Sequence, residues 1–510
     1  MPDDDLDILA GLSGIPAALA EEARALALVD HHVHGCFVDP IDRGVFEESF
    51  NEASPDPIPG FMTQFDSQPG FAFRRWCAPL LGLERHATAD RYWAARSAIA
   101  PAELNRRLLR HAGVEHWLMD TGFSSRAITT PAQMADDARG SASEIVRLEA
   151  LAESLVRDGV TPKEFPEAYR AALREAAAEA VGFKTIAAYR TGFDIDWSAP
   201  TDDAVAAAVE RCAAGGITSP RLADPALETF VIHAAAALGL PLQIHVGFGD
   251  RDLDLHRTNP TLLLDLLRQQ DVRSTPIALL HCYPYHREAG YLAQAFDNVY
   301  FDIGLAINYV GAQGQQLIAE SLELAPFAKQ LYSSDAFGIP ELHLVGSILW
   351  RRAMARVIGR WVTETAWSQA DGIRVMRMIG SDNARRVYGL LTPGGTDFPH
   401  GGLPPPIPPG PRTPRCAPTR ARRAELKLGR DELRDLRGVE RGALAQVVTA
   451  DEEVDAVRVV EGLADPPDPG RIGAHDVGGR RVLAALRLVV EHDARRAAQR
   501  LPGGLPADVP

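Results

Sequence analysis

The stretch Ala-Leu-Ala-Leu-Val-Asp-His-His-Val-His, residues 25–34, decides how the rest of this chain is interpreted. Its apolar first half is typical of a buried parallel strand, and its second half puts histidines at the end of that strand. Side chains alternate between the two faces of a strand, so His32 and His34 are predicted to point to the same side. Two neighbouring imidazoles can bind one divalent metal ion through nitrogen. Alone, a His-x-His pair is a weak indication, and it gains weight only from matching residues later in the chain.

Three later apolar runs each end in a residue type that binds metal ions. They are residues 241–247 with His245, residues 276–282 with His281, and residues 330–336 with Asp335. A single histidine at such a place is more often a core residue with satisfied hydrogen bonds. Histidines and an aspartate at successive strand ends are difficult to explain by packing alone. We therefore expect these side chains to form a metal site together with the first pair.

The composition argues against several classes of protein. The chain has 510 residues, of which 46% are hydrophobic, a proportion that is typical of a soluble globular protein. Its formal net charge of −15 argues against binding to nucleic acid or to an anionic membrane surface. We expect no secretory signal and no membrane-spanning segment. The 5 cysteines are scattered and include no Cys-x-x-Cys pair, which favours a reduced, cytoplasmic environment.

Strand-like and helix-like segments alternate along most of the chain. The predicted strands lie near residues 25–34, 114–121, 144–149, 181–189, 241–247, 276–282, 298–304 and 330–336. Helices are expected between them, among them residues 161–180, 202–214 and 225–239. Strands that alternate with helices form right-handed βαβ units and a parallel sheet, so this order predicts an α/β fold, a closed (β/α)8 TIM-like barrel. Catalytic residues of such barrels lie at the C-terminal ends of the strands, where the candidate metal ligands fall.

Two segments fall outside this alternation. Residues 40–110 are rich in aromatic residues, proline and arginine, and we expect a mainly helical insertion that packs over the site. Residues 401–510 contain no Phe, Trp, Tyr, Met, Asn or Ser, which leaves few large side chains for a core. The chain is therefore divided into a barrel, residues 1–395, and a Pro/Arg/Ala/Gly-rich, low-complexity tail, residues 396–510. We expect the tail to be disordered or to be encoded by a shifted reading frame.

The order of these motifs resembles that of the amidohydrolase superfamily. The resemblance rests on Asp30-x-His32-x-His34, Lys184, His245, His281 and Asp335, and on residues 182–192, 247–250 and 383–390. These segments look like the amidohydrolase-related branch found as the N-terminal domain of fungal FluG-type proteins. The resemblance covers about residues 20–395, and nothing in residues 396–510 looks like the glutamine-synthetase-like second half of those proteins. The long insertion after the first strand also resembles uronate isomerases, a more distant branch.

The resemblance implies a metal site with His32, His34, His245, Asp335 and Lys184 as its ligands. Asp335 is also expected to accept a proton from water, and His281 to act as a ligand or to polarise the substrate. Lys184 matches the position at which some members carry a carboxylated lysine that bridges two metal ions. Its alternative is an ordinary amine that binds a substrate carboxylate. A nitrogen and oxygen ligand set favours Zn²⁺, with Mn²⁺ or Fe²⁺ as alternatives, and one or two ions are expected.

These residues predict a metal-dependent hydrolase that uses an activated water to cleave a C–N (amide-type) bond of a small carboxylated substrate. Arg190, just after the fourth strand, is a candidate to bind that carboxylate, and Tyr283 is a candidate to line the pocket. The alternative for Arg190 is a surface or ion-pair arginine. Two other functions stay open, a decarboxylase or isomerase on the same metal cage and a non-catalytic metabolite-binding barrel. The expected partner is a small molecule, and a homo-oligomer is compatible with the sequence.

Overall fold

The structure is a computed structural model that describes residues 6–54, 56–122, 126–213 and 220–390, together with residues 425–426 and 457–458. The chain divides into two compact units, Met1–Pro408 and Pro409–Pro510. In the second unit, β8 (Glu425–Leu426) pairs antiparallel with β9 (Val457–Arg458). Apart from these strands, the tail predicted to be disordered or frame-shifted, residues 396–510, lies outside the described residues.

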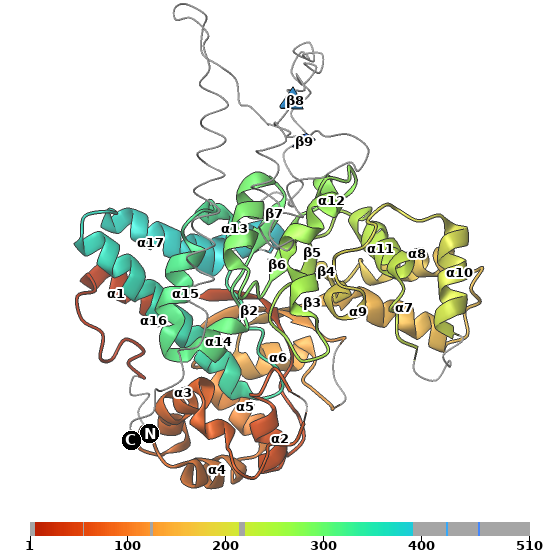
Figure 1. Cartoon of the computed structure of the whole chain (residues 1–510). Helices are drawn as coiled ribbons and strands as arrows, with labels where there is room; N and C mark the ends of the chain where they lie inside the picture. The colour runs from red at the N-terminus through yellow and green to blue at the C-terminus, as the bar shows by residue number, and fades with distance from the viewer. Residues whose placement is uncertain are drawn as a thin grey trace, which may run out of the picture. The chain divides into compact units, whose positions relative to one another are not determined.

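Parallel strands of the first unit form one curled sheet (Figure 1). In the order of both sequence and sheet they are β1 (Leu28–Val33), β2 (Val114–Asp120), β3 (Ser141–Arg147), β4 (Gly182–Thr185), β5 (Leu242–His245), β6 (Ile277–Leu280) and β7 (Val299–Phe301). Parallel neighbours require crossover connections, which helices supply in this chain. The fold is therefore α/β, with a 7-stranded parallel sheet consistent with a TIM-like barrel.

The segment predicted as an eighth strand, residues 330–336, is not a regular strand in the structure. It nevertheless bonds to both edges of the sheet. Leu331 N donates to Phe301 O of β7 at 2.9 Å, and His31 N of β1 donates to Tyr332 O at 3.1 Å. These bonds bring the segment between the first and the last strand, so its side chains face the same site as those of β1 and β6.

Helices lie around the sheet and bury their apolar faces against it (Figure 1). They are α1 (Ala17–Ala25), α6 (Pro131–Ala138), α7 (Leu148–Arg157), α8 (Phe165–Ala176), α9 (Ala187–Arg190), α10 (Asp202–Ala213), α11 (Pro225–Ala236), α12 (Leu264–Leu267), α13 (His286–Ala295), α14 (Ala306–Val310), α15 (Gly314–Ser321), α16 (Pro340–Thr363), α17 (Gln369–Arg377) and α18 (Asn383–Tyr388). The long helix α16 packs against α1, α15 and α5 (Pro101–Leu109), and much of its length is buried. By packing against the sheet, these helices hold the strands, and therefore the residues at the strand ends, in position.

The connection between β1 and β2 is helical. It contains α2 (Arg43–Glu48), α3 (Gln68–Trp76), α4 (Ala89–Ser97) and α5 (Pro101–Leu109). Its aromatic side chains pack together, with ring centroids of Phe46 and Phe50 5.1 Å apart and those of Phe50 and Phe73 5.0 Å apart. Aromatic pairs at such distances add to the stability that burial alone provides. The aromatic content of this segment therefore contributes to a hydrophobic core that it shares with β1, β2 and α16.

Two predicted elements differ from the structure at their ends. The fourth strand was expected to reach residue 189, but α9 begins at Ala187, because Glu149 Oε1 accepts a hydrogen bond from Ile186 N at 2.7 Å and turns the chain. The helix expected from residue 161 begins at Phe165 instead. Its first turn contains Pro166, a residue that suits this position because the missing N–H would be unpaired there.

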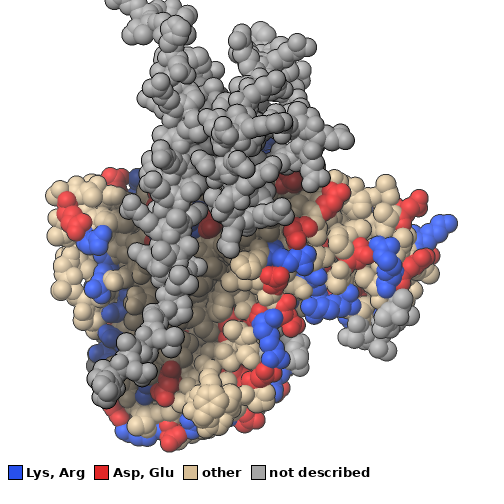
Figure 2. Space-filling view, viewed as in Figure 1, with Lys and Arg blue, Asp and Glu red and all other residues tan. Residues whose placement is uncertain are grey.

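The molecular surface mixes charges of both signs. On the face shown in Figure 2, acidic and basic side chains are interspersed over the helices around the sheet. Among the described residues, no helix combines the length and the apolar character needed to cross a membrane. The described cysteines Cys36, Cys77, Cys212 and Cys282 are all free thiols.

Candidate metal centre

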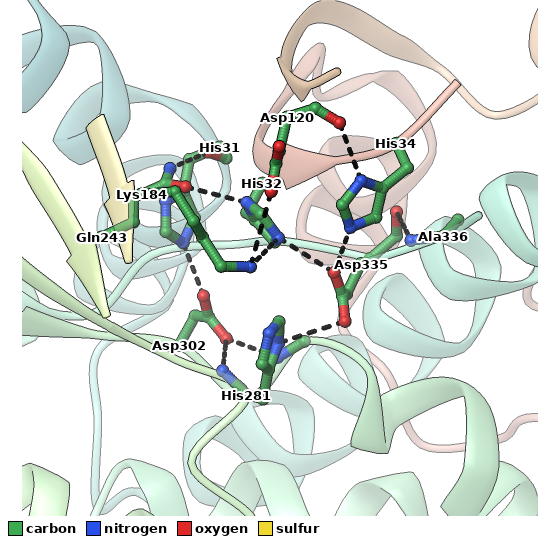
Figure 3. Close-up of polar contacts among 12 residues, drawn as sticks. His31, His32, His34, Asp120, Lys184, Gln243, His281, Asp302, Asp335 and Ala336 are labelled. Carbon is green, nitrogen blue, oxygen red and sulfur yellow. Dashed lines mark hydrogen bonds and ion pairs between the residues drawn. The ribbon is translucent and has the colours of Figure 1, made fainter. Parts of the chain in front are cut away.

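A carboxylate surrounded by imidazoles lies at the C-terminal ends of the strands (Figure 3). Asp335 Oδ1 is 3.0 Å from His32 Nε2 and 3.5 Å from His34 Nε2. Its other oxygen is 3.4 Å from His281 Nδ1. Asp335 therefore connects residues from β1 with the residue that follows β6, and it does so almost without contact with solvent.

The remaining two predicted ligands complete this cluster. The His245 ring, at the end of β5, lies 4.6 Å from the His281 ring. Lys184 Nζ, from β4, lies 2.9 Å from His32 Nε2 and is buried. The structure thus brings together all six side chains that the sequence placed at one metal site.

The hydrogen bonds behind His32 and His34 fix which ring nitrogen is available. Gln243 Nε2 donates to the His31 carbonyl at 2.7 Å, so Gln243 Oε1 must accept, and it does so from His32 Nδ1 at 2.8 Å. His34 Nδ1 donates to the Asp120 carbonyl at 2.8 Å. Both rings therefore carry their proton on Nδ1 and turn an unprotonated Nε2 toward Asp335, which is the tautomer of a metal ligand.

The cluster fits a divalent cation on the chemistry of its donor atoms. Within 4.8 Å of one another lie the donor atoms of His32, His34 and Asp120, and likewise those of His32, His281 and Asp335. His245 Nε2 and His281 Nδ1 are buried without a hydrogen-bond partner among the described residues. Because buried polar atoms are normally paired, such atoms beside a carboxylate indicate a missing positive partner.

The backbone at two of these residues is strained. His281 has φ of +70° and Asp335 has φ of +50°, a region that side chains with a Cβ rarely adopt. Each such residue costs of the order of 1–3 kcal/mol and persists where the surroundings hold it in place. Asp302 Oδ1 provides such a hold, since it accepts the His281 backbone N–H at 2.7 Å. Strain at two neighbouring donors is typical of a site whose geometry serves function.

The protonation states match those of metal ligands. Burial lowers the pKa of His32 to about 4 and holds the pKa values of His245 and His281 well below their usual range. Burial alone would raise the pKa of Asp335, but the facing His281, His32 and His34 side chains lower it well below its usual value. Neutral imidazoles around an ionised carboxylate are the state in which these groups bind a cation.

Asp120 is a donor that sequence reasoning missed. Its Oδ2 accepts hydrogen bonds from Arg147 at 2.5 Å and 3.0 Å and lies 3.9 Å from Lys184 Nζ. Burial acts to raise the pKa of Asp120, yet the Arg147 guanidinium holds it well below its usual range. Burial lowers the pKa of Lys184, while Asp120 and Asp335 oppose that shift. The aspartate directly ends the β2 run, so the strand-end rule that found Asp335 applied to it as well.

A buried layer behind the cluster also escaped prediction. His31 Nε2 lies 2.7 Å from Asp302 Oδ2 (Figure 3). His31 Nδ1 lies 3.1 Å from Tyr388 Oη. Gln243 Nε2 donates to the same Tyr388 oxygen at 2.9 Å. The register of β1 shifts between Asp30 and Val33, so consecutive residues of this strand can both face inward. This layer connects α18 to the candidate ligand His32 through Gln243.

Glu52, in the loop after α2, is a further carboxyl group near the cluster. Burial and the negative charge of Asp335 raise the pKa of Glu52 to about 8. Arg251 N, in the loop after β5, donates to Ala53 O at 3.1 Å, and the Arg251 guanidinium pairs with Asp56. The two loops therefore meet beside the site. No local pattern in the sequence predicts such a contact between distant loops.

The two predicted substrate-binding residues have other contacts. Arg190 Nη2 donates to Glu153 Oε1 of α7 at 2.9 Å, the ion-pair alternative that the sequence left open. Tyr283 is 38% exposed, and its ring stacks on that of His286 at 6.2 Å. Phe248 lies beside Tyr283, with ring centroids 6.4 Å apart. A role for either residue in substrate binding stays a prediction.

Comparison with known proteins agrees with this geometry. The family model described as amidohydrolase matches residues 127–390, more than half of the chain. The chain belongs to the amidohydrolase family. The matched residues include Lys184, His245, His281 and Asp335, whereas the His-x-His pair precedes them.

Two relatives of this amidohydrolase are informative. Protein fluG of Emericella nidulans is 31% identical over 281 residues, which cover 48% of this chain and 32% of fluG. The chain thus matches about a third of the length of fluG, and the activity of the whole fluG protein does not transfer to it. A crystal structure from Lactobacillus casei, described as that of a proposed metal-dependent hydrolase, is 28% identical with a TM-score of 0.64 and covers 72% of this chain and 97% of its own.

A uronate isomerase from Thermotoga maritima is a more distant structural neighbour. It is 13% identical, has a TM-score of 0.48, and covers 73% of this chain and 96% of its own. A likeness at this level carries no argument about the reaction of the amidohydrolase.

Proposed function

We propose that this amidohydrolase is a metal-dependent hydrolase that cleaves a C–N (amide-type) bond of a small molecule. The observation that carries the proposal is the set of neutral, partly unpartnered imidazoles around the ionised Asp335. The family match and the hydrolase-like structural neighbour support the same reaction class.

The residues that would hold the metal are His32, His34, His245, Asp335 and Lys184. Nitrogen and oxygen donors without a thiolate favour Zn²⁺, with Mn²⁺ or Fe²⁺ as alternatives, and the two donor groups leave room for one ion or two. Such an ion supplies positive charge that makes a water molecule more acidic and polarises a carbonyl group. Lys184 enters this set if it is carboxylated; otherwise its amine is available to a substrate carboxylate.

The chain's own groups supply the proton transfers. Asp335, which contacts His32, His34 and His281, is proposed to accept a proton from the attacking water and to deliver it to the leaving nitrogen. His281 is proposed to polarise the substrate carbonyl. Gln243 keeps His32 in the tautomer that this arrangement needs.

The substrate is proposed to be small and carboxylated. Lys184 and Arg190 are the candidate partners of its carboxylate, and Arg190 must exchange Glu153 for the substrate to serve in this way. Tyr283 is proposed to line the entrance. We also propose a cytoplasmic location, in keeping with the free thiols of the described cysteines.

Product analysis tests the proposal. The metal-loaded full chain is incubated with a panel of N-acyl amino acids and cyclic amides, and amine, ammonia and CO₂ are quantified. Release of amine or ammonia that disappears after chelation and returns with metal supports hydrolysis. Release of CO₂, or isomerisation of a sugar acid, would replace the proposal with a lyase or isomerase on the same cage. Tight binding without turnover would favour a metabolite-binding barrel.

A further inference from the structure

A second cavity lies away from the metal centre and shares no lining residue with it. Its volume is about 540 Å³, and its walls come from α3, α16 and the turn between α14 and α15. The basic residues that line it are Arg75, His86, Arg352 and Arg356. Among the described residues that line the cavity, none is an aspartate or a glutamate. In a chain of net charge −15, a cavity with only basic charge is unexpected.

Two of these arginines are held in position by neighbouring groups. Both guanidinium groups lie over the Trp76 ring, that of Arg75 4.5 Å and that of Arg352 4.7 Å from the ring centroid. Ala10 O accepts hydrogen bonds from Arg75 Nη2 at 3.2 Å and from Arg352 Nη1 at 3.1 Å. Guanidinium groups that are already held in place lose little conformational entropy when a ligand binds, so the cavity is preorganised for binding.

The positive charge in this cavity is only partly offset by the described part of the chain, since the Asp7 carboxylate acts on Arg352 without pairing directly with it. Arg75, Arg352 and Arg356 form no ion pair with a described carboxylate, whereas Arg360, one turn further along α16, pairs with Glu364 at 3.6 Å. Burial and the charge of Arg75 lower the pKa of Arg352 to about 10. Like charges that repel one another in a partly buried cavity gain most from a bound anion.

The apolar side chains in the cavity wall indicate that the part of the ligand beyond its anionic group is apolar. Beside the arginines lie the apolar side chains of Phe71, Trp76 and Leu349, and Phe71 is 51% exposed. Cavities of roughly 300–1,000 Å³ hold small organic molecules. Guanidinium groups prefer the planar fork of a carboxylate or the oxygens of a phosphate. We propose that this cavity binds an organic oxyanion, a phosphate or carboxylate group on a small apolar body.

Calorimetric titration of the full chain with phenyl phosphate tests this site. The expected result is one ligand per chain, with affinity that falls as salt concentration rises. Arg356→Glu should weaken binding at least about tenfold, since it places a negative charge on the wall. Arg360→Glu is the matched control, because it makes the same charge change on the same helix outside the cavity and should leave affinity unchanged. Equal affinities of the two variants, or no binding by the parent chain, would overturn the proposal.

Further probes separate the sources of binding. Inorganic phosphate should bind more weakly than phenyl phosphate if the apolar wall takes part, and benzoate reports whether a carboxylate suffices. Asp3, Asp4 and Asp5 precede Leu6 in the sequence and lie outside the described residues. In a chain with these three changed to Asn, unchanged affinity supports a separate ligand. Binding that is detected only in that variant would show that the acidic N-terminus is the occupant, and would overturn the proposal.

Discussion

Two buried polar clusters of this amidohydrolase differ in how their charges are satisfied. In the first, Asp335 lies among imidazoles, two of which have a nitrogen atom without a hydrogen-bond partner in the described part of the chain. In the second, the Glu341 carboxylate of α16 accepts hydrogen bonds from Arg96 Nε at 2.6 Å, from Arg96 Nη2 at 3.3 Å and from the Tyr92 hydroxyl at 3.2 Å. The Arg96 guanidinium also lies 4.4 Å from the centre of the Phe46 ring.

The difference shows how buried charge serves structure in one place and function in the other. Glu341 and Arg96 neutralise each other and fasten α4 to α16, so nothing further is needed there. The Asp335 cluster keeps two imidazole nitrogens without hydrogen-bond partners among the described residues, and two of its residues have strained backbones. Burial alone therefore does not mark a functional site; the indication here is a cluster of metal-binding residue types in which unusual hydrogen bonding and strained backbones occur together.

The largest effect is expected from Asp335→Asn. This change keeps the size of the side chain but removes the proton acceptor and the negative charge that faces three histidines. Turnover should fall by about 10²–10⁴-fold, while the far-ultraviolet circular dichroism stays that of the parent. Turnover within a few-fold of the parent would remove Asp335 from the proton transfer and would erase the contrast between the two clusters.

Glu341→Gln tests the structural cluster. It leaves the Arg96 charge buried without a counter-charge, which costs about 3–5 kcal/mol of unfolding free energy in comparable cases. Urea unfolding measures the loss, with Glu364→Gln in the exposed pair with Arg360 as the control, expected to change stability by less than about 1 kcal/mol. Metal content per folded chain should stay unchanged. A loss of metal with stability intact would contradict the division of roles.

Gln243→Met removes the hydrogen bond that orients His32 while keeping the size of the side chain. Metal affinity should fall about 10–100-fold, as is usual when the partner of a ligating histidine is lost. Tyr388→Phe is the control, since it removes a neighbour of Gln243 and His31 but leaves the acceptor of His32 Nδ1 in place. An equal effect of the two changes would show that the layer acts through packing, not through the His32 tautomer.

The smallest effect concerns pH and the pair of buried carboxyl groups Glu149 and Glu228. Burial and the charge of Glu149 raise the pKa of Glu228 well above its usual 4.5. The folded chain then binds this proton more tightly than the unfolded chain, so the stabilisation is full below pH 4.5 and is lost as pH rises through the folded pKa.

Melting temperatures of the parent and of Glu228→Gln between pH 6 and pH 9 test this linkage. The melting temperature of the variant should exceed that of the parent by an amount that grows with pH and reaches a few °C. In larger domains, a change of 1 kcal/mol in stability shifts the melting temperature by about 2–4 °C. The exposed Glu210→Gln should show no such trend. Parallel pH profiles of parent and Glu228→Gln would contradict the raised pKa.

Residues at strand ends were predictable because their position follows from local pattern. His32, His34, His245, His281 and Asp335 each follow an apolar run, and parallel strands bring such ends together. The sheet order was predictable for the same reason. The eighth segment was predicted as a strand, but the positive φ at Asp335 interrupts it, which no composition indicates.

The contacts that escaped prediction depend on pairing between distant segments. Gln243 and His32 are 211 residues apart, and only the register of the strands and the shifted β1 bring them together. Arg190 and Glu153 are 37 residues apart, so the pairing of this arginine was open from sequence. Glu52 reaches the site through a loop whose path is fixed by its contact with Arg251.

The central claim is that the imidazole cluster holds a metal ion. The direct measurement is metal content per chain, by plasma mass spectrometry, on full-length protein purified without added metal or chelator. The account predicts about one or two equivalents of zinc, manganese or iron, the range expected for such a donor set, and a loss of metal in a His32→Asn, His34→Asn double variant that stays folded. Protein that contains no metal, and recovers none on reconstitution with any of the three, would contradict it.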